Sequence, residues 1–321
     1  MVPAATGSAR APVLWLLTDN KPGHRNQLRG LGARLKALAG ASVYWLDATE
    51  YRIPLWRALL GLAPRLEPNL PVPDLIIAAG SGTHRLLLSL RRIGNARTVV
   101  LMKPGFPLNW IDAAIVPEHD GITDNTAGNT RLLLTEGMIN TLTPLARLTT
   151  KQEALALIGG PSSHYEWDDD VVFDQLLHLM RSYPDWHWTL SGSRRTPDTL
   201  RQRLRDLAGA RVTVAEPEQT HEDWLAHRLA ASRAVWVTPD SASMVYEAVT
   251  SGIPTGLFEL SANTGSRVAR GNALLHQRGR VARWSDHTSV MSAATVPSRS
   301  LWEADRAARW LLQRLPGRTA P

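Results

Sequence analysis

One stretch of the chain, 234–260, constrains the fold more than any other. It begins with an apolar run (234–238) and ends with another (255–260), each with the pattern of a strand buried on both faces of a sheet. Between these runs, apolar residues recur at helical spacing after Ser241, a favourable N-cap residue, and before Gly252, a residue type that often ends helices. A strand–helix–strand unit of this kind predicts a parallel sheet, which binds its ligands at the carboxyl ends of its strands.

The same alternation of apolar runs and helical periodicity covers most of the chain. Further strands are expected at residues 13–18, 42–46, 74–79, 98–102, 113–116, 131–134, 154–158, 186–190 and 211–214. Helices are expected around residues 28–38, 86–90, 171–181, 200–207, 223–231 and 300–315. The fold class that follows is α/β, with doubly wound parallel sheets and right-handed crossovers.

The order of these elements predicts two Rossmann-like domains facing across a cleft, because the strand pattern restarts after residues 144–152. A chain of 321 residues with 44% hydrophobic content is long enough to fill two such cores. The expected divisions are a disordered N-terminus (1–12), a first domain (13–148), a second domain (149–297), and a C-terminal helix and tail (298–321). Packing of this C-terminal helix back on the first domain is one expected arrangement.

Composition restricts the chemistry of the chain. It has no cysteine, which excludes disulfides and thiolate metal sites. Its formal net charge of +7 suits nucleic acid, anionic lipid headgroups and phosphorylated small molecules alike. It has no long run of lysine and arginine and no nucleic-acid-binding motif, so nucleic acid is not an expected partner. No apolar run reaches the roughly 18 residues that span a bilayer, and a cytoplasmic location is expected.

Three loops of the second half follow predicted strands and carry the residue types that bind phosphate. Glycine lets the backbone approach an anion, helix amides receive negative charge, and arginine offers a fork of donors. Each loop alone is typical of an ordinary strand-to-helix turn, but three at one sheet edge favour a binding site. The candidate donor-binding residues are Gly159, Gly160, Pro161, Ser162, Ser191, Gly192, Arg194, Arg195, Ser241, Ala242, Ser243 and Glu247. Glu247 either accepts ribose hydroxyls or is a solvent-facing helix residue.

The first half carries polar side chains in the turn expected after its first strand. His24 in this turn is a candidate general base, because an imidazole titrates near neutral pH, and a plain surface histidine is the alternative. His119 and Asp120 end a later strand and are the alternative bases. The remaining acceptor-side candidates are Lys21, Gly23, Asn26, Gln27 and Lys103.

Two further motifs each have two interpretations. Asp168, Asp169 and Asp170 directly precede a predicted helix, which favours helix capping over binding of a divalent ion, and no metal is expected. Residues 51–66 combine leucines and Trp56 with arginines. That pattern suits either a helix on an anionic membrane surface or a helix that covers a sheet.

Six motifs, in this order along the chain, resemble one protein family. They are TDNKPGHRNQ, AAGSGTHR, MKPGFP with IVPEHD, IGGPSSHY, SGSRRTP and VTPDSASMVYEA. Together they span residues 13–260 and are similar to those of bacterial proteins described as mitochondrial-fission-protein-like or as glycosyltransferases of the GT-B fold. A more distant resemblance is to the enzyme that adds N-acetylglucosamine to the lipid-linked peptidoglycan precursor.

The resemblance implies roles for particular residues. It places Gly23 and His24 beside the acceptor, and the loop 241–243 with Glu247 on the phosphates and ribose of the donor. The first loop differs from the glycine-rich loop of that enzyme, because it contains the sequence Asp-Asn-Lys-Pro at residues 19–22.

Residues and resemblance together lead to one expected function and two alternatives. The expected function is a glycosyltransferase, independent of metals and cofactors, that moves a sugar from a nucleotide sugar to an envelope glycan such as lipopolysaccharide or to a lipid-linked acceptor. Arg194 or Arg195 would stabilise the departing diphosphate. Peripheral contact with the inner face of the membrane is one expected location. The alternatives are a nucleotide-sugar epimerase or hydrolase on the same fold, and a non-catalytic interaction protein.

Overall fold

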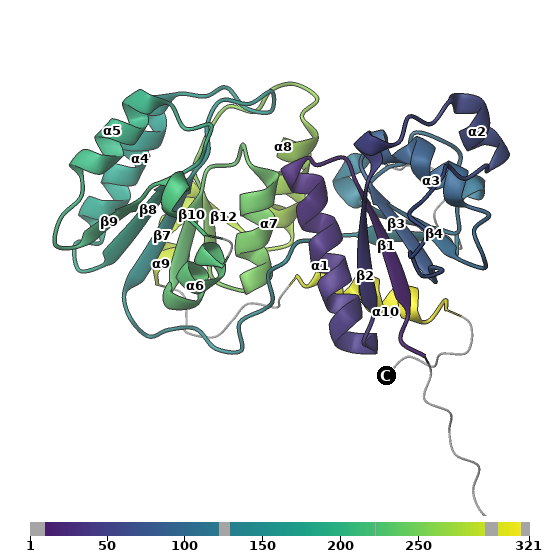
Figure 1. Ribbon diagram of the computed structural model, residues 1–321. Helices are drawn as coiled ribbons and strands as arrows, with labels where there is room; N and C mark the ends of the chain where they lie inside the picture. Colours follow the sequence, from purple (N-terminus) through teal and green to yellow (C-terminus); the bar gives the residue numbers. More distant parts are fainter. Residues whose placement is uncertain (1–9, 122–128, 222, 293–300, 316–321) are drawn as a thin grey trace, which may run out of the picture. The chain divides into compact units, whose positions relative to one another are not determined.

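The computed structural model describes residues 10–121, 129–221, 223–292 and 301–315. The chain divides into two compact units (Figure 1): unit 1 consists of Met1–Thr141 and Glu303–Pro321, and unit 2 of Leu142–Trp302. Each unit contains one parallel six-stranded sheet with flanking helices, so the α/β fold class with two Rossmann-like bodies is confirmed. Of the segment 1–12, predicted to be disordered, residues 1–9 lie outside the described residues, whereas the carbonyl oxygen of Pro12 accepts a hydrogen bond of 2.8 Å from the amide of Ser42.

Unit 1 is built on a sheet in which every pair of neighbouring strands is parallel. Its strands are β1 (Val13–Thr18), β2 (Ser42–Asp47), β3 (Leu75–Ala79), β4 (Arg97–Leu101), β5 (Ala113–Pro117) and β6 (Leu132–Thr135). They are ordered β2-β1-β3-β4-β5-β6, so the strand order reverses between β1 and β3. Leu14 of β1 pairs with Leu75 of β3. Every residue of β1, β3 and β5 is buried, as expected of apolar strands covered on both faces.

The helices of unit 1 are α1 (Pro22–Ala39), α2 (Leu55–Leu60), α3 (His84–Leu90) and α10 (Glu303–Leu312). Helix α1 begins earlier than the sequence predicts. Of the candidate residues expected in a turn, Lys21 is the N-cap residue and the others lie in the first two turns of the helix. Pro22 suits the first turn, because its missing amide donor would have no partner there. The helix ends at Gly40, whose φ of 65° is the left-handed conformation common at helix C-termini.

The C-terminal helix α10 belongs to unit 1 and lies beside α1 (Figure 1). Asp305 Oδ1 accepts a hydrogen bond of 2.6 Å from Arg34 Nε of α1. Buried Glu303 accepts a hydrogen bond from the amide of Glu136. Burial raises the pKa of Glu303, and its hydrogen bond with Arg306 acts in the opposite direction. The end of the chain therefore completes the first unit, although all of unit 2 separates it from α1 in sequence.

Unit 2 repeats this plan with a second sheet. Its strands are β7 (Glu153–Ile158), β8 (His187–Gly192), β9 (Val212–Ala215), β10 (Ala234–Val237), β11 (Thr255–Leu257) and β12 (Ala282–Arg283). The order is β12-β11-β10-β7-β8-β9, so it reverses between β7 and β10. Ala234 of β10 pairs with Ala154 of β7, and all residues of β10 are buried.

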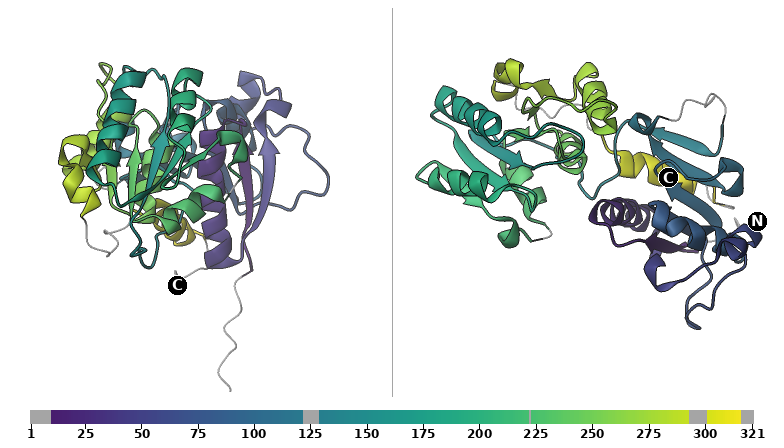
Figure 2. Two further views of the ribbon diagram at one scale, coloured as in Figure 1. Left: turned by 90° about the vertical axis from the view of Figure 1, so that its left-hand side faces the viewer. Right: turned by 90° about the horizontal axis from the view of Figure 1, so that it is seen from above.

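The helices of unit 2 are α4 (Asp169–Ser182), α5 (Asp198–Asp206), α6 (Trp224–Ala231), α7 (Ala242–Ser251), α8 (Arg267–Gln277) and α9 (His287–Met291). Helices α4 and α5 lie side by side (Figures 1 and 2), joined by the ion pair between Arg203 and Asp170. With α9 they bury one face of the sheet around Trp188 and Trp236. Asp168 accepts hydrogen bonds from the first amides of α4, so the capping interpretation of residues 168–170 is confirmed. The sequence analysis did not predict α8, β12 or α9.

Residues 51–66 contain only the short helix α2. Its one buried side chain is that of Ala58, while Leu55, Trp56, Leu59 and Leu60 are exposed. Among the described residues, no helix is long and apolar enough to cross a membrane.

Two glycines of α1 give a test of the packing of unit 1. A Cβ at Gly30 would lie 2.1 Å from the carbonyl oxygen of Asn140, whereas one at Gly23 would have nothing within 4 Å. We expect Gly30→Ala to lower the free energy of unfolding by about 1–3 kcal/mol through overpacking. Gly23→Ala should raise it by roughly 0.5 kcal/mol or leave it unchanged, because alanine favours helix. Urea denaturation measures both, and equal effects would contradict the packing described.

Candidate functional site

Each sheet has one point at which its strand order reverses. Crossovers leave in opposite directions there and open a crevice beyond the carboxyl ends of the two strands. In unit 1 this point lies between β1 and β3, and in unit 2 between β7 and β10. These strand ends are therefore the places where ligand-binding residues are expected.

In unit 1 the loop after β1 places Asp19 against His24 of α1. Asp19 Oδ1 lies 2.8 Å from His24 Nδ1. The Asp19 side chain is 6% exposed, whereas that of His24 is 21% exposed, so the imidazole is the more accessible of the two. When the ring is neutral, this contact holds the proton on Nδ1 and leaves Nε2 able to accept a proton. His24 thus has a buried orienting carboxylate that the sequence analysis did not assign.

Glycines after β3 make room for this pair. A Cβ at Gly80 would lie 2.2 Å from His24 Nδ1 and 2.8 Å from Asp19 Oδ2, and the φ of Gly80 is 88°. A Cβ at Gly82 would lie 3.1 Å from the Cβ of Asp19. His84, two residues further on, has its pKa lowered by burial and also by the charge of His24. The backbone after β3 therefore packs directly on the Asp19–His24 pair.

Two residues at strand ends of unit 1 have left-handed backbone conformations. Asn20, after β1, has a φ of 61°, and Met102, after β4, has a φ of 71°. Asparagine tolerates this region, but methionine adopts it only where its surroundings impose it, which is common near ligand sites. Met102 Sδ accepts a hydrogen bond from Nε2 of Gln27, which is buried. The acceptor-side candidate Gln27 therefore links α1 to the residue that follows β4.

The other acceptor-side candidates do not all converge. Lys21 precedes α1 and its Nζ lies 3.8 Å from Asp19 Oδ2, so it borders the pair. Gly23 and Asn26 lie on α1 beside His24 in sequence, and a Cβ at Gly23 would meet open space. Lys103 instead donates a hydrogen bond to the carbonyl oxygen of Gly121 at 3.4 Å.

The two alternative bases of unit 1 are buried. His119 and Asp120 follow β5, and their side chains are 6% and 7% exposed. His119 Nε2 lies 3.9 Å from Asp120 Oδ1, so each has a charged or polar neighbour within the protein. Of the three candidate bases, His24 alone combines an orienting carboxylate with substantial exposure.

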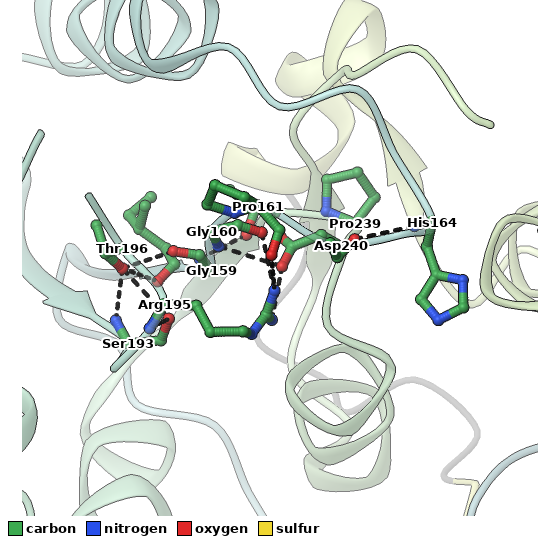
Figure 3. A network of polar contacts seen from close by, with 12 residues as sticks. Gly159, Gly160, Pro161, His164, Ser193, Arg195, Thr196, Pro239 and Asp240 are labelled. Carbon is green, nitrogen blue, oxygen red and sulfur yellow. Dashed lines mark hydrogen bonds and ion pairs between the residues drawn. The ribbon is translucent and has the colours of Figure 1, made fainter.

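In unit 2 the loops after β7, β8 and β10 meet at a buried carboxylate (Figure 3). The side chain of Asp240 is 0% exposed, and its Oδ2 lies 2.7 Å from Arg195 Nη2 and 3.2 Å from the amide nitrogen of Gly160. Arg195 Nη1 also donates to the carbonyl oxygens of Gly160 (2.8 Å) and Pro161 (3.1 Å). One arginine therefore joins all three loops.

The amides of the glycine loop are occupied within the protein. Gly159 donates to Thr238 Oγ1 at 2.7 Å, and Gly160 donates to Asp240. A Cβ at Gly159 would lie 2.3 Å from both carboxylate oxygens of Asp240, and one at Gly160 would lie 2.0 Å from the carbonyl oxygen of Arg195. The close approach that these glycines permit therefore serves Asp240 and Arg195, and both amides have acceptors within the protein.

The serine candidates of the first two loops also have local partners. Ser162 Oγ accepts a hydrogen bond from the amide of His164. Ser191 and Gly192 are the last two residues of β8 rather than part of a loop. Buried Thr196, which the sequence analysis did not single out, donates to the carbonyl oxygen of Ile158 and holds the loops after β7 and β8 together.

The remaining donor-side candidates are Arg194, next to Arg195 in the loop after β8, and four residues at the start of α7. Arg194 is exposed and makes no hydrogen bond or ion pair within the part of the chain that the structure describes. Ser241 occupies the N-cap position of α7, but its side chain makes no capping hydrogen bond, contrary to expectation. Ala242 and Ser243 form the first turn of α7, where amides have no acceptor within the helix, and Glu247 lies in its second turn.

His164 lies at the other side of the network (Figure 3). Burial lowers its pKa, and the positive charges of Arg267 and Arg195 act in the same direction. Both effects favour the neutral form of the ring, whereas the charge of Asp240 acts in the opposite direction.

A cavity of about 300 Å³ in unit 2 has Pro239 among its lining residues. Aromatic side chains including Tyr165, Phe258 and Trp284 line it. None of the predicted donor-binding residues is among its lining residues, so those residues do not converge on this cavity.

The two carboxylates that the sequence analysis missed share a position. Asp19 directly follows the end of β1, and Asp240 follows the end of β10 by three residues. In each, one oxygen, Asp19 Oδ2 or Asp240 Oδ1, is buried without a hydrogen-bond partner among the described residues. A carboxylate that closely follows a central strand, in TD and TPD, was the signal available in the sequence.

Fold and site define a two-unit Rossmann-like α/β protein of the GT-B type, in which a buried carboxylate contacts a histidine or an arginine at each reversal of strand order. The chain belongs to the family described as mitochondrial fission ELM1, whose family model matches residues 22–315. This confirms the family named from the sequence motifs.

Known proteins similar to this chain include one relative by sequence and several solved structures. "Uncharacterized protein RP120" of Rickettsia prowazekii (strain Madrid E) is 25% identical over 298 residues, covering 76% of this chain and 82% of that protein. The UDP-N-acetylglucosamine 2-epimerase of Neisseria meningitidis bound to UDP-N-acetylglucosamine has a TM-score of 0.54 at 10% identity, covering 94% and 99% of the two chains. The S. aureus MnaA–UDP structure has a TM-score of 0.53 at 13% identity, covering 95% and 97%. At these identities the likeness shows a shared fold.

The ion pair between Arg195 and Asp240 gives a stability test. Arg195→Met should lower the free energy of unfolding of the protein by about 1–3 kcal/mol, because it leaves a buried carboxylate without its charged partner. The double variant Arg195→Met with Asp240→Asn should lose less unfolding free energy than the sum of the losses in the two single variants, since the residues are in contact. Arg194→Met is the matched control and should change stability by less than about 0.5 kcal/mol. Additive effects in the double variant would contradict the pairing.

Proposed function

We propose that this protein is a glycosyltransferase that moves a sugar from a nucleotide sugar to a hydroxyl group of an envelope glycan or lipid-linked saccharide, at the cytoplasmic face of the inner membrane. The observation that carries the proposal is the Asp19–His24 pair at the carboxyl ends of β1 and β3. A nucleotide-sugar donor is supported by the fold shared with structures that hold UDP or UDP-N-acetylglucosamine.

The proposed chemistry assigns each proton and electron pair to an atom. The acceptor oxygen attacks the anomeric carbon of the sugar while His24 Nε2 takes the proton of the hydroxyl group. The bond from that carbon to the diphosphate oxygen breaks, and the diphosphate leaves with the bonding electrons. Asp19 keeps the imidazole in position and stabilises the imidazolium ion that forms.

On the donor side, the proposal assigns the diphosphate to Arg194 and to the first amides of α7, at Ala242 and Ser243. Arg195 is not assigned this role, because moving its guanidinium toward a phosphate would leave buried Asp240 without its charge partner. Glu247, one turn further along α7, is assigned to the ribose hydroxyls. Arginine and amide groups are sufficient donors for a diphosphate, so the proposal includes neither a metal nor a cofactor.

Ligand binding and product analysis separate this proposal from its two alternatives. A nucleoside diphosphate or nucleotide sugar that binds the folded protein should add RT ln(1 + [L]/Kd) to its free energy of unfolding and so raise its melting temperature. An epimerase or hydrolase would convert UDP-N-acetylglucosamine or release UDP without any acceptor. A non-catalytic interaction protein would show no shift with any nucleotide of the panel.

The Asp19–His24 pair predicts a specific separation of binding from turnover. We expect His24→Ala to lower sugar transfer to a bacterial lipid extract by roughly 10²–10⁴-fold, the usual contribution of a positioned base. Asp19→Asn should also lower turnover, because it removes the charge that stabilises the imidazolium. Both variants should retain the thermal shift with UDP, and His187→Ala, an exposed histidine of β8, should behave as wild type. Loss of UDP binding in His24→Ala would show that the two units do not divide the work as proposed.

The two neighbouring arginines of unit 2 should differ in nucleotide binding. Arg194→Met should weaken binding of UDP by about tenfold or more, since a charge-assisted contact to phosphate contributes about 1.5–3 kcal/mol. Its melting temperature without ligand should match that of the wild type. Calorimetric titration with UDP measures the change, and an unchanged Kd would remove Arg194 from the proposed site.

A further inference from the structure

Unit 1 exposes an apolar surface around the short helix α2. We define the α2 surface as the five large apolar side chains that are 41–57% exposed there: Leu55, Trp56, Leu59, Leu60 and Leu62. Single exposed leucines are ordinary in proteins, but a group of five on one short segment marks a contact surface.

The backbone of α2 is held firmly in this position. Arg91, which directly follows α3, donates hydrogen bonds to the carbonyl oxygens of Ala58 (2.9 Å) and Leu59 (2.6 Å) at the end of the short helix. The Ala58 carbonyl also accepts a hydrogen bond from the amide of Gly61. Gly61 ends the helix with a φ of 66°, and a Cβ there would lie 3.1 Å from the side chain of Arg92. The apolar side chains are therefore displayed by a fixed helix, with the two arginines that follow α3 packed at its end.

Positive charge surrounds the α2 surface. The guanidinium of Arg57 lies 5.8 Å from the centre of the Trp56 ring. Arg52 and Arg85 line a cavity of about 400 Å³ that also touches Pro54, the residue before α2. Around α2 and α3, residues 50–67 and 84–92 contain six arginines and two glutamates. They are Arg52, Arg57, Arg65, Arg85, Arg91 and Arg92, with Glu50 and Glu67. Six arginines against two glutamates give this region a net charge of +4.

We propose that the α2 surface binds an anionic lipid bilayer, with its leucines and Trp56 at the boundary between headgroups and acyl chains and a lipid phosphate in the cavity of Arg52 and Arg85. Helices that lie in the membrane interface combine leucine and tryptophan with arginine. The aliphatic part of each arginine lies along the apolar layer, and its guanidinium contacts lipid phosphates. A protein partner is less well matched, because a stable interface involves about 20–30 residues on each side. Here the apolar surface consists of five side chains within eight residues, four of them on α2 and one, Leu62, just after it.

The cavity of Arg52 and Arg85 also borders the candidate site of unit 1. Gly82 lines this cavity, and its backbone packs against Asp19 of the Asp19–His24 pair. A phosphate held by the two arginines would thus lie next to the proposed base, as a lipid-linked acceptor requires. This use of the surface rests on the proposed function, whereas binding to a bilayer does not.

Vesicle flotation with the full-length protein tests the inference. The wild type should float with vesicles of phosphatidylcholine and phosphatidylglycerol at low salt, bind much less to pure phosphatidylcholine, and be released by high salt. Trp56→Ser with Leu59→Ser should lower binding by at least about tenfold, because it removes the inserted apolar side chains. Arg52→Gln with Arg85→Gln should lower binding to the anionic vesicles by roughly tenfold or more and remove the preference for them.

Controls distinguish the possible failures. Val171→Ser changes an apolar residue of unit 2 that is 40% exposed, and it should bind vesicles as the wild type does. Each variant should keep the wild-type melting temperature and its thermal shift with UDP, so a folding defect or a donor-site defect would be visible.

The inference is overturned if the wild type fails to bind anionic vesicles or if the α2 variants bind unchanged. It is also overturned if the wild type self-associates in solution and the α2 variants abolish that association, since a second copy would then cover the surface. Vesicle binding without any nucleotide binding would uphold this inference and reject the proposed function.

Discussion

Both units depend on the same close contact, in which a glycine at the end of one central strand lets a carboxylate from the neighbouring strand press against the backbone. In unit 1 the glycine is Gly80 and the carboxylate is Asp19, and in unit 2 they are Gly159 and Asp240. At either glycine, a Cβ would lie within 2.8 Å of a carboxylate oxygen. The contact occurs where the strand order reverses, so each sheet holds a buried acid at the entrance of its crevice.

A buried carboxylate needs a hydrogen-bonded partner, and the two units supply partners of different chemistry. Asp19 faces the imidazole of His24, a type of side chain that can accept and release a proton, whereas Asp240 faces the guanidinium of Arg195, which only donates hydrogen bonds. The first pair is therefore suited to proton transfer. The second is suited to holding three loops in a fixed arrangement, beside which exposed Arg194 and the start of α7 can meet a ligand.

The sequence predicted the sheets well because buried parallel strands leave a strong signal. The strand β1 lies where its apolar run predicts, and β8 extends two residues beyond its predicted end, which moves Ser191 and Gly192 out of the loop. The strand β12 has two residues and is too short for a pattern, and α8 has few apolar residues at regular spacing. Helix α1 was expected to start later, because the polar residues after Pro22 resemble a turn.

The site was predictable only in part. Position after a strand indicated the right loops, but it could not show which charged groups pair with one another. Asp240 contacts Arg195 across 45 residues of sequence, and this contact, which depends on the order of strands in the sheet, removes Arg195 and the glycine amides from the groups open to a ligand. The assignments of His24, Arg194 and Glu247 to steps of a transfer reaction remain predictions.

The most direct test of the account is nitrogen NMR of His24 in the folded protein at a pH where its ring is neutral. The account predicts the tautomer with the proton on Nδ1, held by Asp19, and Nε2 unprotonated. It also predicts that Asp19→Asn disturbs this preference while Asn20→Gly, which suits the left-handed backbone at the next position, does not. A proton on Nε2 in the wild type, or the same tautomer in Asp19→Asn as in the wild type, would contradict the assignment of His24 as the base.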